Sequence, residues 1–475
     1  MSLVKKIGVL GIALFGFLPV TKIKSAEKFI RGDVDGNRVI NIVDPITALN
    51  YLFRRGPELS CLDAADSNDD GRININDGVY TLNYLFRRGP RPSEPFLNEG
   101  YDLTRDNLRC RGQADLENII EIRQQDIPLV IRESGTKENP KIYVLREDVS
   151  TRRISIFSQI WNAIIIQDAN NIILDGLGHR VIYGAPSDLD VYGILVRNSR
   201  NIAINNLVMY DNDNDNDNGR KKSAIFFDNV NFGSIGNNRI AMSRSSGSCI
   251  RLEGGELSQI VNNMISVLVP DSDGILFYSS PNNLFSNNRI EADYNSRCIS
   301  LISSDRNIFV KNVINSSSEA KGIYLEGSIF ATHFFDSSIN EFRFANYDIF
   351  FGRGSNGWIT LTNVNYPNDK VFFESNKVYL NREWYLDVLV RDGEGALEGV
   401  DVRSINRNNV VTRYPYTDET GRIGMTLLSY RQYSNERFAA YPYRISVSKK
   451  GYVAQSRVIE LNRNAELEFV LERRQ

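Results

Sequence analysis

Two twelve-residue acidic stretches near the N-terminus have the residue types and the spacing of a cation site. Both place oxygen-bearing side chains at positions 1, 3, 5, 9 and 12. These side chains are Asp33, Asp35, Asn37, Asn41 and Asp44 in the first stretch, and Asp66, Asn68, Asp70, Asn74 and Asp77 in the second. Hard oxygen ligands at these offsets are typical of an EF-hand-type Ca²⁺ loop, and neither stretch contains a His or Cys that would favour zinc. Gly71 suits the sharp turn at position 6, whereas Arg38 stands there in the first stretch, which predicts weaker binding or a distorted turn.

Each acidic loop leads into a predicted helix, and the two copies are related by a period of 33 residues. The phrase LNYLFRRGP at 49–57 recurs letter for letter at 82–90, and its Gly-Pro pair ends the helix. Paired calcium loops, each followed by one exit helix, resemble a type I dockerin. The resemblance implies Ca²⁺ as the cofactor, a cohesin-like protein module as the partner and a polysaccharide-degrading assembly. It also implies that loop positions 10 and 11 choose the partner, and these are Ile42, Val43, Ile75 and Asn76.

A repeat between about residues 161 and 351 positions a second group of chemically useful side chains. A small or polar residue followed by Ile and an alternating apolar run recurs, with the Ile residues separated by 31, 25, 25, 24, 24 and 26 positions. The Ile positions are Ile194, Ile225, Ile250, Ile275, Ile299, Ile323 and Ile349. A near-constant period of this length predicts a solenoid, and the period-two alternation predicts strands. We therefore expect a parallel β-helix in which residues about 24 apart lie above one another.

Three charged residues fall two positions before successive Ile residues of this repeat. Asp273, Arg297 and Lys321 should form a vertical triplet on adjacent rungs about 4.8 Å apart. A polysaccharide lyase needs cations to neutralise a uronate carboxylate and a base to remove the α-proton, while aromatic rings stack on the sugar. An ion-pair ladder on a solvated face is the alternative interpretation. The neighbouring outward positions predicted to contact substrate are Phe226, Arg251, Glu253, Tyr278 and Tyr324.

A second repeated phrase, Asn-Asn-x-apolar, accompanies the Ile repeat at 205–206, 237–238, 262–263 and 287–288, with a single Asn312 one coil later. Stacked Asn side chains at a corner can hydrogen-bond from one coil to the next. The repeats resemble the right-handed parallel β-helix of the pectate-lyase-like superfamily. That resemblance implies polysaccharide as a partner, but the superfamily includes lyases, glycoside hydrolases, adhesins and accessory proteins. Whether the chain is an enzyme is left open.

The chain divides into five predicted segments, and the predicted fold class is mainly β with one helical module. A basic start followed by an apolar run predicts a signal peptide over 1–26, and the dockerin-like repeats occupy 27–95. A linker over 96–127 precedes the β-helix and its N-terminal cap over 128–365. The segment 366–475 has alternating strands and turn signals, which predict a β-sandwich resembling immunoglobulin-like or carboxypeptidase-regulatory-like modules.

The composition limits the classes of partner, and the positions of the cysteines limit which disulfides can form. The formal net charge of −2 argues against nucleic acid as a partner, and no stretch beyond the signal peptide predicts an integral membrane protein. Cys249 and Cys298 share a column two coils apart, about 9–10 Å, which exceeds the reach of a disulfide and predicts two free thiols. Cys61 and Cys110 are the plausible pair, and whether they are joined is left open.

Two functional hypotheses follow. The first is a secreted, extracellular or cell-surface protein that binds calcium, docks through the dockerin-like module, and binds, with or without cleaving, polysaccharide on the β-helix. The second is a non-catalytic structural or adhesion protein in which the β-helix is a rigid spacer.

Overall fold

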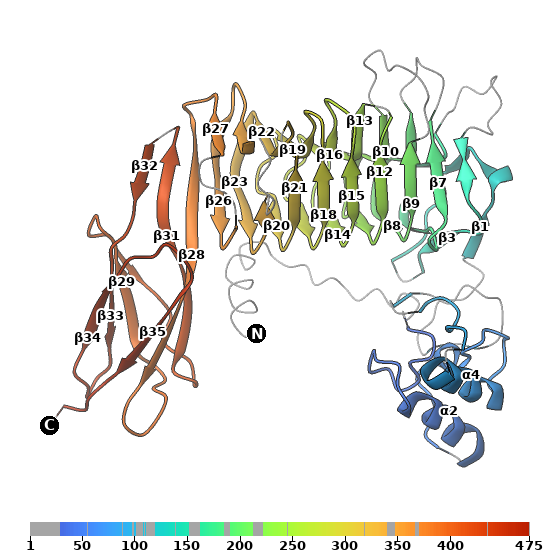
Figure 1. Ribbon diagram of the computed structural model, residues 1–475, viewed down its shortest axis with the longest axis horizontal. Helices are drawn as coiled ribbons and strands as arrows, with labels where there is room; N and C mark the ends of the chain where they lie inside the picture. The colour runs from blue at the N-terminus through green and yellow to red at the C-terminus, as the bar shows by residue number, and fades with distance from the viewer. Residues whose placement is uncertain are drawn as a thin grey trace. The chain divides into compact units, whose positions relative to one another are not determined.

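The computed structural model describes residues 29–474 apart from 55, 88, 97–98, 101–107, 109, 111–118, 138, 152–161, 185–190, 212–221, 245, 318, 340–346, 366–369 and 435. The predicted signal peptide lies outside these residues. The chain forms two compact units (Figure 1). One contains the N-terminal module up to Glu121 together with Ser134–Tyr143, and the other contains Ile122–Glu133 and the chain from Val144 onward. No helix in the described part of the chain combines the length and the apolar character needed to cross a membrane.

The N-terminal module is built from helices α2 (Val43–Arg54), α3 (Leu62–Ala65) and α4 (Ile75–Arg87). Helices α2 and α4 follow the two acidic loops and lie against each other. A small apolar core of Val34, Ala48, Leu59 and Ala65 holds the loops and helices together.

Part of the stretch predicted as a linker belongs to this module. Phe29 and Gly100 form an antiparallel bridge, so a segment beyond the predicted boundary lies beside the beginning of the module. Phe96 is buried and its ring meets Tyr84 edge-on with the centroids 5.3 Å apart. The module therefore extends beyond the predicted boundary at residue 95.

The second unit is dominated by stacked coils, each contributing one strand to each of three faces. In Figure 1 these strands form the ribbed body that runs from β7 to β27. The first face, which carries the Ile repeat, contains β5 (Ile164–Gln167), β8 (Tyr192–Asn205), β10 (Lys222–Asn231), β13 (Gly247–Glu253), β16 (Asp273–Tyr278), β19 (Arg297–Ile302), β22 (Lys321–Glu326), β25 (Tyr347–Phe351) and β27 (Val371–Phe373). Strand β2 (Leu129–Ile131) pairs in parallel with β5 at the start of this face.

The other two faces follow the same coil order. The second face contains β6 (Asn170–Asp175), the later part of β8, β11 (Ser234–Gly236), β14 (Gln259–Val261), β17 (Leu284–Ser286), β20 (Ile308–Val310), β23 (Ser328–Phe335), β26 (Asn356–Thr362) and β28 (Val378–Arg391). The third contains β4 (Val149–Ser150), β7 (Arg180–Tyr183), β9 (Val208–Asp211), β12 (Arg239–Met242), β15 (Met264–Val267), β18 (Arg289–Ala292), β21 (Val313–Ser316) and β24 (Ser338–Ile339). Strands β1 (Ile119–Ile122) and β3 (Lys141–Leu145) precede the regular coils.

The strand register confirms the stacked coils that the Ile repeat predicts. Ile194, Ile225, Ile250, Ile275, Ile299, Ile323 and Ile349 are successive partners in parallel pairs. All seven are fully buried inside the stack. This part of the chain is therefore a parallel β-helix, because residues about 24 apart lie on consecutive rungs.

The repeated Asn-Asn phrase has two distinct roles at one corner of each coil. The first Asn of a pair, as in Asn262 and Asn287, adopts a left-handed conformation with φ of 58° and 55°. In the pairs at 237–238, 262–263 and 287–288 the second Asn is buried, and in the last two of these its side-chain oxygen accepts hydrogen bonds from the Asn of the coil before. In the pair at 205–206 it is the second residue, Asn206, that has the left-handed φ, of 57°. Asn238 donates both its backbone N–H and its Nδ2 to Asn263, each at 3.0 Å. Asn263 makes the same two bonds to Asn288 at 2.9 and 3.0 Å.

The coils continue past the predicted boundary at residue 365. Strand β27 pairs in parallel with β25, and β28 pairs in parallel with β26. Strand β28 then continues without a break and pairs antiparallel with β31 (Arg422–Tyr433) and parallel with β35 (Ala465–Val470). The aromatic stacks Phe350–Phe372 and Phe351–Phe373 tie β27 to β25.

The remaining C-terminal strands form two layers around one apolar core. Strands β28, β31, β32 (Glu436–Ala439) and β35 make one layer. The other has the order β30 (Val411–Arg413), β29 (Asp401–Ile405), β33 (Tyr443–Ser448) and β34 (Gln455–Ile459). Both layers contribute side chains to the shared core, among them Leu386, Val402, Ile445 and Phe469.

Candidate functional site

The carboxylate at position 1 of each acidic loop binds the backbone of the turn it precedes. Asp33 accepts a hydrogen bond from the N–H of Arg38 at 2.8 Å, and Asp66 accepts the equivalent bond from Gly71 at 2.7 Å. Arg38 has φ 70° and Gly71 has φ 78°. Arg38 thus adopts the left-handed conformation that position 6 requires, so the turn of the first loop is not distorted, although a side chain there carries strain.

The carboxylate at position 12 closes each loop in the same manner. Asp44 accepts a hydrogen bond from the N–H of Asn41, and Asp77 accepts one from the N–H of Asn74, each at 2.8 Å. Both aspartates are completely buried at the first turn of the helices α2 and α4. The two loops therefore share one backbone geometry, which the common spacing of their oxygens predicts.

The carboxylates converge in a way that suits a cation. Oxygens of Asp33, Asp35 and Asp44 lie within 4.8 Å of one another. Burial raises the pKa of Asp33 and of Asp44, and burial together with the Asp66 carboxylate raises the pKa of Asp77 to about 6. The buried Oδ1 of Asp77 has no hydrogen-bond donor among the described residues. Clustered buried carboxylates of this kind fit a bound Ca²⁺, whose charge would offset the cost of burying them.

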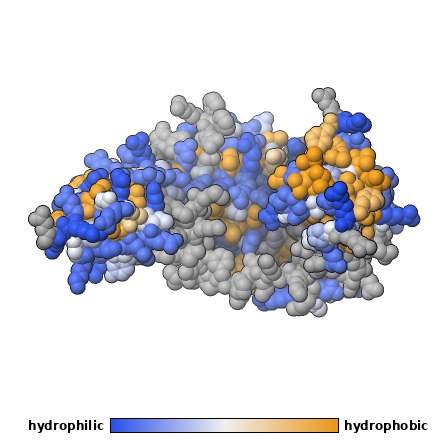
Figure 2. Space-filling view, turned by 90° about the horizontal axis from the view of Figure 1, so that it is seen from below, coloured by the Kyte–Doolittle hydropathy of each residue, from blue (hydrophilic) through white to orange (hydrophobic). Residues whose placement is uncertain are grey.

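The residues predicted to bind a partner are all exposed, and they belong to a larger apolar surface. Ile42, Val43 and Ile75 are 49%, 47% and 53% exposed, and Asn76 is also exposed. Four further large apolar side chains of the module, which the loop positions alone do not predict, are also exposed: Ile46, Phe53, Val79 and Phe86. The identical repeated phrase places Phe53 and Phe86 at equivalent helical positions, so the repeat itself indicates that both rings have similar exposure. Figure 2 shows hydrophobic residues gathered on the face of this module that is turned to the viewer.

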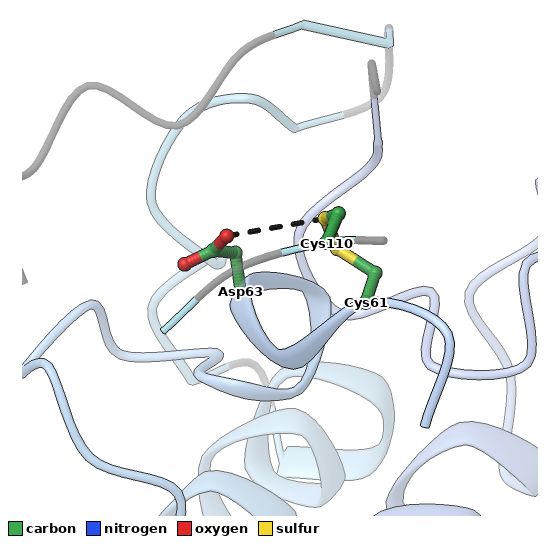
Figure 3. Close-up of side chains that lie close together, drawn as sticks. All are labelled: Cys61, Asp63 and Cys110. Carbon is green, nitrogen blue, oxygen red and sulfur yellow. Dashed lines mark hydrogen bonds between the residues drawn. A yellow bond between two sulfur atoms is a disulfide. The ribbon is translucent and has the colours of Figure 1, made fainter. Parts of the chain in front are cut away.

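A disulfide joins Cys61 to Cys110 inside the N-terminal module (Figure 3). Cys61 precedes the first residue of α3, and the carboxylate of the buried Asp63 lies 3.9 Å from the Cys110 sulfur. Helix α3 leads directly into the second acidic loop, so the bond ties that loop to a later segment of the chain. Cys249 and Cys298 are free and buried, as the column spacing predicts.

The predicted charged triplet lies on three adjacent rungs, but its carboxylate is fully engaged. Asp273 pairs in register with Arg297, and Arg297 pairs with Lys321. Arg297 Nε lies 2.6 Å from Asp273 Oδ1 and Arg297 Nη2 donates to Oδ2 at 3.1 Å, while Ser300 Oγ also donates to Oδ1. Asp273 is 4% exposed. A carboxylate in this environment anchors Arg297 more readily than it removes a proton from a substrate.

The next rungs carry cations stacked on aromatic rings. Arg297 lies over the ring of Tyr324 at 5.2 Å, and Lys321 Nζ lies 5.4 Å from the centroid of Phe350. Burial and the neighbouring Arg297 lower the pKa of Lys321. Burial and a 2.8 Å hydrogen bond from its hydroxyl to Glu326 raise the pKa of Tyr324 to about 12. We refer to Arg297, Lys321, Tyr324 and Phe350 as the cationic face.

The other residues predicted to contact substrate have different environments. Tyr278 is 44% exposed, as expected for a contact residue. Phe226 is buried in an outer apolar cluster with Ile165 and Leu195, so its assignment as an exposed stacking ring is wrong. Arg251 covers the Phe226 ring at 4.7 Å and donates to Glu253 at 2.5 Å. The period-two pattern predicts that Phe226 points outward, but it does not predict that neighbouring side chains cover the ring.

The register and the three faces define the chain as a parallel β-helix protein with an additional acidic-loop module. No protein-family model matches the sequence, and a comparison with curated proteins finds no match. Among solved structures, the periplasmic alginate epimerase AlgG is 16% identical with a TM-score of 0.34, and the match covers 54% of each chain. The surface adhesin PfbA of Streptococcus pneumoniae is 10% identical with a TM-score of 0.32, over 73% of this chain and 82% of that one.

A bacteriophage CBA120 tailspike protein 2 domain is 9% identical with a TM-score of 0.32, over 67% of each chain. The chain spans about half the length of the epimerase. At these identities and scores, the strand register of the chain itself carries the assignment of the fold, and no activity is transferred from these proteins.

Proposed function

We propose that this chain is an exported, calcium-binding modular protein that docks to a partner through its N-terminal module and presents a polysaccharide-binding β-helix. The observation that carries the proposal is that both acidic loops are closed by the same pair of carboxylates, at positions 1 and 12; we call each such pair a carboxylate cage. Asp33 with Asp44, and Asp66 with Asp77, use the same hydrogen bonds at the same offsets 33 residues apart. Duplicated geometry of this kind is expected of two functional ion sites and is not required for a helical hairpin to fold.

The docking role rests on the exposed apolar surface of helices α2 and α4. A monomeric soluble protein rarely gathers this many exposed large apolar side chains on one small module. Ile42, Val43 and Ile75 lie next to the calcium loops, so bound Ca²⁺ would fix their orientation. The dockerin-like arrangement makes a cohesin-like protein module the proposed partner.

The polysaccharide role rests on the cationic face. Arg297 is held in place by Asp273, and Tyr324 and Phe350 form stacked rings with centroids 5.7 Å apart. Fixed cations beside aromatic rings suit a chain that carries carboxylates and flat sugar rings. Because Asp273 is bound to Arg297 and Ser300, the proposal gives this face a binding role and gives Asp273 no role as a base. The rigid-spacer hypothesis is the outcome if no glycan binds.

Calorimetric titration of the full chain with CaCl₂ tests the calcium proposal. We expect two sites in the parent chain and one site fewer in Asp66→Ala, because the position 1 carboxylate would then be missing from one cage. Glu291→Ala, which removes an exposed acid on β18, is the matched control and should leave both sites intact. Equal stoichiometry in Asp66→Ala and the parent would overturn the proposal.

Binding of an oligogalacturonate to the full chain tests the cationic face. We expect Lys321→Ala to weaken binding by about tenfold and added salt to weaken it further, since exposed charge pairs are screened. Lys450→Ala removes an exposed cation from the turn that follows β33 and should have no effect. Unsaturated ends detected by ultraviolet absorbance would contradict a purely binding role, and unchanged affinity in Lys321→Ala would remove the face from the proposal.

A further inference from the structure

A continuous row of aromatic rings crosses from the last coils of the β-helix onto the C-terminal strands. The row consists of Phe330 on β23, Trp358 on β26, Tyr379 on β28, Tyr433 on β31 and Phe438, which lies on β32. Successive ring centroids are 5.1, 5.6, 5.2 and 5.9 Å apart, and Trp358 stacks on Tyr379 with an interplanar angle of 7°. These strands are neighbours in the sheet (Figure 1). We refer to the five rings as the aromatic row.

The aromatic row is built on the outside of the sheet. The residues that alternate with it, Ile329, Ile359 and Leu380, are fully buried, so Trp358 and Tyr379 point outward. Phe330 and Phe438 remain 40% and 55% exposed. Such rings add nothing to the core, so their exposure requires another explanation.

Local sequence features hold the rings in line. Trp358 and Tyr379 are register partners across β26 and β28. Gly357 has φ 112°, and a Cβ there would lie 3.1 Å from Cγ of Phe330, so glycine lets this ring approach the row. Arg431 lies over Tyr379 at 4.4 Å and donates to Asn381 at 2.9 Å, which fixes a guanidinium along the row.

A polar depression of about 540 Å³ borders the row at three points. Its lining includes Asn356, Lys377 and Ser434, and each of these lies within two residues of a ring of the row. The lining also contains the hydrogen-bonding side chains of Arg353, Glu374, Ser375 and Asn376. The depression and the row therefore place flat apolar surfaces beside donors and acceptors.

We infer that the aromatic row and the adjoining depression form an oligosaccharide-binding site. A pyranose ring presents an apolar face that stacks on an aromatic ring and a rim of hydroxyl groups that needs hydrogen-bond partners. The row supplies several such faces in sequence, which suits a chain of sugars, and the depression supplies partners for the hydroxyl groups at its edge. The site goes beyond the proposed function, because it uses the second face of the coils and shares no residue with the cationic face.

Titration of the full chain with hexasaccharides, followed by tryptophan fluorescence, tests this inference. The probes are cellohexaose, xylohexaose and hexagalacturonate, which separate neutral from acidic chains. We expect at least one of them to change the tryptophan emission, and Trp358→Phe to remove most of that change while Trp384→Phe retains it. Tyr433→Ala and Asn376→Ala should each weaken binding by about tenfold.

Matched controls separate this site from the cationic face. Tyr416→Ala removes an aromatic ring that is 68% exposed outside the row and should leave the affinity unchanged. Hexagalacturonate binding that is lost in Lys321→Ala but unchanged in Tyr433→Ala would overturn the inference and leave the proposed function intact. Absence of binding by all three hexasaccharides would also overturn it, and the row would then be a surface for another class of partner.

Discussion

Several carboxylates in the acidic loops are buried, and burial destabilises the charged form of an aspartate. Asp77 is completely buried, and the Asp66 carboxylate adds to the effect of burial on its pKa. A bound divalent cation reverses this balance, because it favours the charged form of every ligand. Ion binding and proton release are therefore coupled at this residue.

The coupling predicts a pH dependence with a definite sign. The folded pKa of Asp77, about 6, lies above its ordinary value of 3.8, so without Ca²⁺ the charged side chain destabilises the fold above pH 6. We expect this contribution to be relieved as the pH falls from 6 to 4. In the presence of Ca²⁺, affinity should instead weaken below pH 6, and binding at pH 6 should release protons to the buffer.

Calorimetry in buffers of different ionisation enthalpy measures the released protons. Asp77→Asn removes the titrating group and should abolish the proton release that this residue contributes. An equal release in Asp77→Asn and the parent chain would show that other groups carry the coupling.

The sequence predicts the position of a residue well where the residue belongs to a repeat. It predicts the burial of a side chain poorly where neighbouring side chains on the outer surface determine that burial. The register of Asp273, Arg297 and Lys321 follows from spacing alone, and so does the separation that keeps Cys249 and Cys298 apart. The sequence does not predict that Ser300 donates a hydrogen bond to Asp273, and it does not predict that Phe226 is buried. Both depend on which side chains fill the outer surface, and period-two alternation carries no information about that.

Strands and corners owe their stability to a column of buried amides. Each Asn of the column satisfies its own coil and the one before it, so no member can be removed without leaving donors unpaired. Asn312 ends the column in the same position, since Asn288 donates to its Oδ1 at 2.9 Å from the backbone and 3.1 Å from Nδ2. The repeated phrase predicts the column, although it does not reveal that the two Asn residues of a pair have different tasks.

Asn263→Ala should destabilise the β-helix by roughly 2–4 kcal/mol, because it leaves the Asn238 donors without their acceptor and removes a donor to Asn288. The midpoint of denaturant unfolding, followed by circular dichroism in the strand region, measures the change. Asn408→Ala is the matched control in an exposed turn and should shift the free energy of unfolding by less than about 0.5 kcal/mol. Similar effects for both variants would mean that the buried column contributes little.

A second polar column was not predicted at all. Asn283 and Asn307 are buried, and the backbone N–H of Asn283 donates to Asn307 Oδ1 at 2.9 Å, while Nδ2 of Asn283 donates to carbonyl oxygens of its own coil. Ser258 stands in this column one coil earlier and donates its backbone N–H to Asn283. Because the column mixes Ser with Asn, its letters do not repeat even though its hydrogen bonds do.

The chain consists of two units with separate cores, and the paired acidic loops at 33–44 and 66–77 both belong to the unit with the N-terminal module. A ligand stabilises the state that binds it, so Ca²⁺ should act on the N-terminal module and not on the coils. Differential scanning calorimetry of the full chain should show two transitions, and millimolar CaCl₂ should raise the temperature of one of them. Removal of Ca²⁺ with EDTA should return that transition to its original temperature. A shift of both transitions by the same amount would contradict independent units.

The joining of coils and C-terminal layers by β28 has a consequence for assembly. A stack of parallel rungs ends in a row of unpaired backbone groups, which is a template on which another copy could add its own strands. Here the same strand that finishes the last turn of the tube also belongs to the next domain and pairs with β31. The strands that follow β28 therefore cover the backbone edge of the second face, where another copy could otherwise add its own strands.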